Sequence, residues 1–298
     1  MKNPFRKIDF KKFKALMVDF DGTITEKGVN QIDPEIVKEF ARLLKTDFPV
    51  AICTGRQLDS FKRRIKPLHE YLEKHRLLSK LKNLYLIAEN GAIGYYYDPT
   101  TKRYKIFHKA DWPKDFPKKK FEAGLIKVTK NFARLLDHKI PIVLRPKDME
   151  LNVHDTYKMS DEIYKSILKY IKKFPYKNTR KIMHVGNSGL GCLVCPANAD
   201  KDSGIKAFHD FLFTKRDVKF NTKDKRIREI MVVGDNPQKG GNDHYFLNGT
   251  YGTAFSVCER CREKFFKMPY LVRDEKGKLL FNNKGTLFLV RHLKHLSP

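Results

Sequence analysis

Two aspartates, Asp19 and Asp21, end a short apolar run in the stretch LMVDFDGTITEKG, which begins at Leu16. Side chains two residues apart on a strand point to the same side of it, so the two carboxylates are brought close together. Like charges at that distance repel and raise a pKa, unless a cation or a proton intervenes. The spacing therefore predicts a bound metal ion, a proton that moves between different roles, or both.

Three further polar residues lie where other predicted elements begin or end. Thr54 ends the apolar run of AICTGR, where its hydroxyl would lie beside backbone amides that open a helix and form an oxyanion site. Lys201 lies just ahead of a predicted helix. Asp235 ends the run of VVGDNPQKGGND, with Asn242 and Asp243 shortly after it. An anion site beside a carboxylate pair is the chemistry that these residue types favour.

The elements that must position these residues alternate between strand and helix over the first 90 residues. Apolar runs predict strands over residues 15–20, 49–54 and 83–88. Residues 33–45 are predicted to form a helix with Asp33 as its N-cap and Pro34 at its first position, and residues 57–74 a second helix that Pro67 kinks. This order indicates a parallel sheet covered by helices, whose ligands gather at the carboxyl ends of the strands. Asp19, Asp21 and Thr54 lie at those ends.

The pattern changes between about residue 93 and residue 198. We expect a hairpin over residues 93–109, a helix over roughly 118–136, strands over 140–145 and 149–154, a helix over about 160–173 and a second hairpin over 181–196. Residues 201–212 and 229–236 then resume the alternation of helix and strand. The sequence therefore predicts an α/β fold with an inserted α+β domain. Its limits are residues 1–93 and 199–298 for the two parts of the main domain and 94–198 for the insert.

In this order the motifs resemble those of the haloacid dehalogenase superfamily. DFDGT is similar to its first motif, CTGR to the second, Lys201 in ADKDSGIKAF to the third, and GDNPQKGGND to the fourth. The sequence AENGA at residues 88–92 and the large insert are similar to the type IIB branch, which is Cof-like and mostly contains sugar-phosphate phosphatases. The resemblance implies a Rossmann-like parallel-sheet core with an inserted cap domain.

The resemblance also implies roles for individual residues. Asp19 would be the nucleophile that forms an aspartyl-phosphate, and Asp21 would be the general acid and then the general base. Phosphate would be bound by Gly22, Thr54, Gly55 and Lys201, and Mg²⁺ by Asp19, Asp21 and Asp235, with Asn242 and Asp243 in a supporting position. Six residues, NPQKGG, separate Asp235 from Asn242, more than is usual for the family. Which acid completes the metal shell is therefore left open.

The insert would close over the site as a lid and select the substrate. Its polar candidates for substrate contacts are Arg145, Lys147, His184, Asn187 and Ser188. Each is equally compatible with an ordinary strand or loop position.

The net charge is the unusual bulk property, because 61 Lys and Arg residues face 34 Asp and Glu residues, which leaves +27. Such a field favours phosphorylated metabolites or nucleic acid, and compositional bias of the source is the alternative explanation. No apolar run is long enough for a membrane span or a signal peptide, so we expect a cytoplasmic protein. Five cysteines indicate reduced thiols, although the pairs CLVC (192–195) and CERC (258–261) could in principle bind zinc.

The resulting hypothesis is a Mg²⁺-dependent phosphatase of a small phosphorylated metabolite, such as a sugar or polyol phosphate. A phosphotransferase or phosphomutase with the same intermediate is one alternative. A nucleic-acid-binding or end-processing protein, motivated by the charge, is another.

Overall fold

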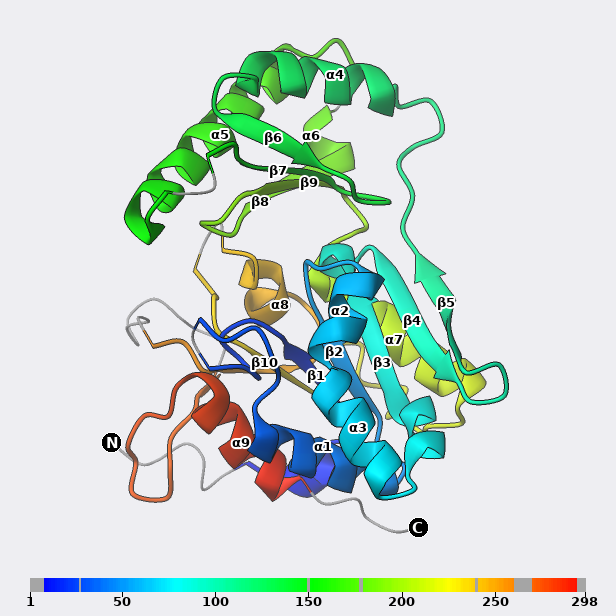
Figure 1. The fold of residues 1–298 in the computed structure, drawn as a ribbon. Helices are drawn as coiled ribbons and strands as arrows, with labels where there is room; N and C mark the ends of the chain where they lie inside the picture. The colour runs from blue at the N-terminus through cyan, green and yellow to red at the C-terminus, as the bar shows by residue number, and fades with distance from the viewer. Residues whose placement is uncertain are drawn as a thin grey trace.

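Two β-sheets organise the chain in the computed structural model (Figure 1), which describes residues 8–26, 28–148, 151–176, 179–238, 241–259 and 270–293. The larger sheet has the strand order β12-β11-β10-β1-β2-β3-β4-β5. Its strands are β1 (Ala15–Asp19), β2 (Val50–Cys53), β3 (Leu84–Ala88), β4 (Ile93–Asp98), β5 (Arg103–Lys109), β10 (Ile230–Gly234), β11 (Thr253–Ser256) and β12 (Tyr270–Leu271). From β12 to β3 all neighbours are parallel, which confirms the predicted α/β class.

Helices cover both faces of this sheet. They are α1 (Pro34–Lys45), α2 (Leu58–Arg64), α3 (Lys66–Lys74), α7 (Lys201–Lys215), α8 (His244–Asn248) and α9 (Asn282–His292), with short 3₁₀ turns η2 (Phe10–Lys12), η3 (Leu78–Asn83) and η4 (Glu89–Gly91). Alternate residues of β1 explain the two layers: Leu16 and Val18 pack toward α1, α3 and α9, whereas Met17 packs toward α7 and α8.

Local signals set the helix ends as predicted. Asp33 accepts hydrogen bonds from the backbone amides of Glu35 (2.8 Å) and Ile36 (3.2 Å), and Pro34 opens α1. The predicted kink near Pro67 is a break at Ile65 between α2 and α3. At the start of α7, Asp200 and Ser203 form a capping box.

The hairpin of residues 93–109 does not belong to the inserted sheet. Its first strand, β4, pairs antiparallel with β3, and β5 pairs with β4, so the hairpin extends the large sheet. A hairpin pattern predicts the local pairing but not which sheet edge it joins. The insert with a sheet of its own therefore starts after Lys109 rather than at residue 94, and we propose residues 110–198 as its limits.

The smaller sheet has the order β6-β7-β9-β8, with antiparallel neighbours throughout. Its elements are α4 (Lys118–Thr129), β6 (Ala133–Leu136), β7 (Ile142–Pro146), α5 (Val153–Lys173), α6 (Thr179–Ile182), β8 (Met183–Asn187) and β9 (Cys192–Pro196). Helices α4 and α5 cover one face, and the other face points toward the large sheet (Figure 1). This is the α+β cap that the sequence predicted.

Two local predictions in the cap are wrong. The helix expected to reach residue 136 ends at Thr129, and residues 133–136 instead form β6, which pairs with β7. The strand expected over residues 149–154 is absent from its described part, because Asn152 accepts a hydrogen bond from the Asp155 amide (3.0 Å) and so begins α5. Residues 149 and 150 lie outside the described residues.

Candidate active site

A buried lysine lies between two carboxylates at the carboxyl end of β1. Lys201, the first residue of α7, donates hydrogen bonds from Nζ to Asp19 (2.6 Å) and to Asp243 (2.5 Å), and all three side chains are inaccessible to solvent or nearly so. Burial alone would lower the pKa of Lys201, but the charges of Asp19 and Asp243 outweigh it and raise that pKa well above 10.5. The lysine therefore stays positively charged.

The positive charge of Lys201 does not balance the negative charges of the carboxylates around it. Asp19, Asp235 and Asp243 each offer a carboxylate oxygen within 4.8 Å of the others, and Oδ2 of Asp19 is buried without a hydrogen-bond partner. Burial, and then repulsion by Asp243, raises the pKa of Asp19 to about 7 although Lys201 opposes the shift. Burial, and then repulsion by Asp243 and Asp19, raises the pKa of Asp235 well above its ordinary value. The unpaired oxygen and the excess negative charge fit a hard cation with oxygen ligands, such as Mg²⁺.

The contacts of Asp243 bear on which acid of the fourth motif could complete the metal shell. One of its oxygens accepts from Lys201, and the other accepts from the backbone amides of Asp235 (3.0 Å) and Asn236 (3.2 Å). Both oxygens are therefore engaged in holding the lysine and the loop after β10. Asn242 accepts a hydrogen bond from the side chain of Asn236 (3.0 Å). These contacts fit supporting positions for both residues and leave Asp235 as the better candidate ligand.

The loop after β1 passes close to Asp235. Gly22 has a φ of +71°, and a Cβ at this position would collide with Oδ2 of Asp235. Only glycine adopts this conformation without strain and permits the approach. The Gly22 amide donates to the hydroxyl of Thr25 (3.1 Å), so it is used within the turn. Gly22 therefore shapes the site by allowing the loop to approach Asp235.

Asp21 lies in a different environment from Asp19. Its side chain is 52% exposed and interacts electrostatically with Arg145 of the cap. It forms a two-point ion pair with Arg56, which donates from Nη2 (2.5 Å) and Nε (3.0 Å). The two aspartates that the sequence placed side by side are thus separated into one buried and one accessible group. A buried carboxylate held by a lysine suits a nucleophile, and an accessible one suits proton exchange with substrate and water.

Thr54 and Gly55 lie in the loop between β2 and α2. Thr54 is buried, and its hydroxyl accepts a hydrogen bond from the Arg56 amide (3.2 Å). Helix α2 begins only at Leu58, so Thr54 does not cap it, and the expected helix-end anion site is replaced by a loop. Because Asp19 of β1 pairs with Cys53 of β2, Thr54 still lies at the same sheet edge as the carboxylates.

The comparison with protein families matches residues 16–236 to the model of the haloacid dehalogenase-like hydrolases. The chain belongs to this family. The match covers all the residues that converge on Lys201 except Asp243. No curated protein sequence matches the chain.

Solved structures of haloacid dehalogenase-like fold resemble it at low identity. An IMP-bound, N-terminally truncated IMP-nucleotidase from Plasmodium falciparum has a TM-score of 0.60 at 15% identity, over 95% of this chain and 68% of that one. A crystal structure from Eubacterium rectale has a TM-score of 0.54 at 16% identity, over 95% and 100%. A structure showing a trigonal-bipyramidal intermediate in a phosphoryl-transfer superfamily has a TM-score of 0.55 at 15% identity, over 85% and 90%. These likenesses support the fold.

One functional feature of this hydrolase was not predicted from the sequence. In the AENGA stretch, Glu89 (φ +53°) and Asn90 (φ +61°) adopt left-handed backbone conformations, and their amides donate to Arg56 and Thr54 of the neighbouring loop. The buried Glu89 side chain accepts a hydrogen bond from the amide of Ile140 in the cap (2.9 Å). The stretch therefore connects the loop between β2 and α2 with the cap. The left-handed backbone of Glu89 and Asn90, which makes this connection, could not be predicted from the residue types.

The five cap candidates of this hydrolase do not all face the core. Arg145 on β7 and His184 on β8 lie on the sheet face that points toward the core, where His184 contacts the ring of Tyr245 on α8 (5.4 Å between centroids). Asn187 points the other way, since it accepts from Ser160 (2.7 Å) and donates to Asp161 (2.8 Å) of α5.

The remaining two candidates lie at the edges of the cap. Ser188 donates to the carbonyl of Gly191 within the hairpin turn (3.0 Å), and the Lys147 side chain is exposed. The contacts of Asn187 and Ser188 hold the cap together and argue against a substrate role for either residue.

The cysteines contradict one expectation. Cys53, Cys192 and Cys195 are free and buried, but Cys258 is disulfide-bonded, so the expectation of reduced thiols fails there. Cys192 packs toward the cap helices and Cys195 toward the core, so the CLVC pair faces opposite directions, which is a poor geometry for binding one zinc ion. Among the described helices, none has the length and apolar character needed to cross a membrane.

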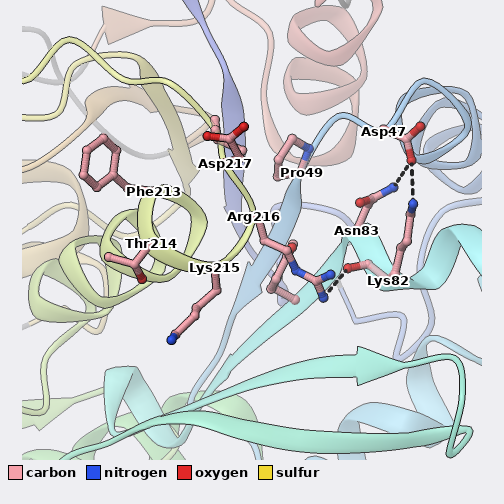
Figure 2. Close-up of a pocket in the computed structure, with 11 residues that line it drawn as sticks. Asp47, Pro49, Lys82, Asn83, Phe213, Thr214, Lys215, Arg216 and Asp217 are labelled. Carbon is pink, nitrogen blue, oxygen red and sulfur yellow. Dashed lines mark hydrogen bonds and ion pairs between the residues drawn. The ribbon is translucent and has the colours of Figure 1, made fainter.

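A separate cavity of about 510 Å³ lies at the opposite end of the large sheet (Figure 2), beside Pro49 and Asn83 just before β2 and β3. Asp47 in its wall accepts a hydrogen bond from Asn83 (2.8 Å), and Arg216 donates to the carbonyl of Lys82 (3.4 Å). Four of the drawn polar residues, Asp47, Lys82, Asn83 and Arg216, thus bind one another. The cavity includes none of the residues that the sequence singled out.

Proposed function

We propose that this hydrolase is a Mg²⁺-dependent phosphatase that acts on a small phosphorylated metabolite through an aspartyl-phosphate on Asp19. The observation that carries the proposal is the buried Asp19 carboxylate, which has one oxygen on Lys201 and the other oxygen unpartnered beside Asp235. Membership of the family supports the hydrolytic reaction. The IMP-bound state of the Plasmodium nucleotidase supports a small phosphorylated substrate, and we propose a sugar or polyol phosphate.

In the first half-reaction a carboxylate oxygen of Asp19 bonds to phosphorus while the bond from phosphorus to the leaving oxygen breaks. Asp21 takes up a proton from solvent, to which its side chain is exposed, and donates that proton to the leaving alcohol. Lys201, Thr54 and the amide of Gly55 are the donors we place around the transferring phosphoryl oxygens.

In the second half-reaction a water molecule gives its proton to Asp21 and bonds to phosphorus, and the bond between phosphorus and Asp19 breaks. Inorganic phosphate leaves, and both aspartates return to their starting states. Asp243 keeps Lys201 in place in both steps, because it accepts from the ammonium group and from two backbone amides.

The carboxylates of Asp19 and Asp235, with the backbone carbonyl of Asp21, are the groups that would hold Mg²⁺. When bound, the ion offsets the repulsion between the carboxylates and the phosphoryl group and lowers the barrier to attack. Burial, and then repulsion among the carboxylates that a single buried lysine only partly offsets, raises the pKa values of Asp19 and Asp235.

Removal of the divalent ion is expected to silence the enzyme. Treatment with EDTA should lower phosphate release from p-nitrophenyl phosphate by about 10³-fold, and added Mg²⁺ should restore it. Mg²⁺ should also raise the melting temperature, because an ion bound only by the folded state stabilises that state. Full activity in EDTA would show that the metal assignment is wrong.

Replacing Asp21 by asparagine should slow both half-reactions, because asparagine neither donates the proton to the leaving group nor accepts one from water. We expect kcat to fall by about 10² to 10⁴-fold. The phosphoenzyme should accumulate and appear in intact-mass spectra as a protein with one added phosphoryl group. An Asp21→Asn protein with wild-type kcat would remove Asp21 from the mechanism.

A panel of phosphorylated metabolites, assayed for free phosphate, tests the proposed substrate class. Release of free phosphate from sugar or polyol phosphates supports hydrolysis. Loss of substrate without free phosphate, with the phosphoryl group recovered on a second sugar, would instead identify a phosphotransferase.

A further inference from the structure

Arginines gather on the cap face that covers the site. On β7, Ile142 and Leu144 pack toward the cap helices, whereas Val143 packs with the core cluster. Arg145 follows at the position two residues after Val143 and therefore lies on the same, core-facing side. Arg134 of β6 pairs directly opposite Arg145, so both side chains share this face.

No acidic side chain of the described residues forms an ion pair with either of these two arginines. Among the described residues, the Arg145 side chain has neither a hydrogen bond nor an ion pair, and Nε of Arg134 is buried without a partner. The neighbouring acid, Asp21, is already paired with Arg56. Two cationic side chains side by side without anions are unfavourable, and a bound anion would relieve the repulsion.

The electrostatic effects of neighbouring charges on the pKa of Arg145 agree with its place on the core-facing side of the cap sheet. Arg145 keeps contact with solvent, but partial burial and then the charges of Arg56 and Arg134 lower its pKa, whereas Asp21 raises it. Arg64 of α2 is affected in the same way, first by burial and then by Arg56. The arginine cluster thus includes Arg134 and Arg145 of the cap and Arg56 and Arg64 of the core.

The position of these arginines between Asp19 and the cap matches the expected path of the leaving portion of the substrate. The phosphoryl group is transferred to Asp19 in the buried core, so the rest of the substrate must extend past Asp21 toward the cap. Arg56 contacts Asp21 through Nε and Nη2, which leaves Nη1 available on that path.

We propose that Arg134 and Arg145 of the cap, together with Arg56 of the core, bind a second anionic group on the leaving portion of the substrate. This inference rests on the proposed phosphatase function and narrows it to phosphate monoesters that also carry a carboxylate or a second phosphate. Arginine suits both groups, because its planar fork donates two parallel hydrogen bonds to either.

Two matched substrate pairs test the proposal and distinguish the two anions. 3-Phosphoglycerate differs from glycerol 3-phosphate by a carboxylate in place of a hydroxymethyl group, and glucose 1,6-bisphosphate differs from glucose 6-phosphate by a second phosphate. In at least one pair, the substrate with two anionic groups should have a kcat/KM at least about tenfold higher than the substrate with one. Arg145→Gln should bring that ratio close to one. Arg103→Gln, an exposed arginine on β5, is the matched control and should leave the ratio intact.

A binding measurement separates this inference from the phosphatase assignment. In the Asp19→Asn protein with Mg²⁺, calorimetry should show about tenfold tighter binding of the two-anion member, and Arg145→Gln should abolish the difference. Two results would contradict the second-anion site but not the phosphatase assignment. One is phosphate release without a preference for the substrate with two anionic groups in either pair, and the other is such a preference that persists in Arg145→Gln. Arg145-dependent binding of the substrates without any phosphate release would instead support the second-anion site and contradict the phosphatase assignment.

Discussion

Replacing Asp19 by asparagine is expected to lower kcat by about 10⁴-fold or more, because the amide cannot serve as the nucleophile that receives the phosphoryl group. The fold should persist, since asparagine has nearly the same shape and relieves part of the repulsion among the buried carboxylates. Phosphate release at saturating Mg²⁺, with circular dichroism and a thermal melt on the same sample, measures both effects.

The control for this variant is Asp59→Asn. Asp59 lies on α2 near the site, but its side chain is 90% exposed and its ion pair with Lys62 (3.5 Å) is weak. This variant should retain wild-type kcat. An Asp19→Asn protein that turns over at a rate similar to Asp59→Asn would refute the nucleophile assignment.

Replacing Lys201 by methionine is expected to remove turnover and to lower the free energy of unfolding by about 3–5 kcal/mol. The buried lysine is held by Asp19 and Asp243, and its loss leaves those carboxylates without their positive partner. Urea unfolding, followed by fluorescence and circular dichroism, gives the change in free energy.

Lys206→Met is the matched control on the same helix. Lys206 pairs with Asp210 (2.5 Å), but both side chains are about half exposed, so the loss should be about 0–1 kcal/mol. If Lys201→Met were no more destabilising than Lys206→Met, the buried network would not hold the site as described.

Local signals in the sequence predicted the parallel core well. The strands β1, β2, β3 and β10, the caps of α1 and the position of Lys201 at the start of α7 depend on apolar runs and capping residues that act over a few residues. The topology then requires the carboxyl ends of adjacent parallel strands to meet at one edge, which brings together Asp19, Thr54 and Asp235.

Strand pairings between segments far apart in the sequence were harder to predict. The hairpin of residues 93–109 was recognised, but its attachment to β3 is decided by contacts along the whole sheet edge. Residues 133–136 form a strand because β7 lies beside them, although their pattern continued that of the preceding helix. Tertiary context overrides local propensity at such positions.

The candidate site shows the same division. The role of Asp243 depends on a loop that returns to the backbone amides of Asp235 and Asn236, and loop length alone does not reveal that return. Arg134 was not singled out because only its pairing opposite Arg145 gives it meaning. For Asn187 both a substrate contact and an ordinary strand position were compatible with the sequence, and only the pairing of its strand shows that its side chain turns toward α5.

The most direct test of the account is to locate the phosphoryl group on the protein. The Asp21→Asn variant is mixed with a phosphate monoester and Mg²⁺, quenched in acid and digested, and its peptides are sequenced by mass spectrometry. If Asp19 is the nucleophile, one phosphoryl group is expected, on the carboxylate of Asp19. A phosphoryl group on any other residue, or phosphate release with no phosphorylated peptide at any time point, would contradict it.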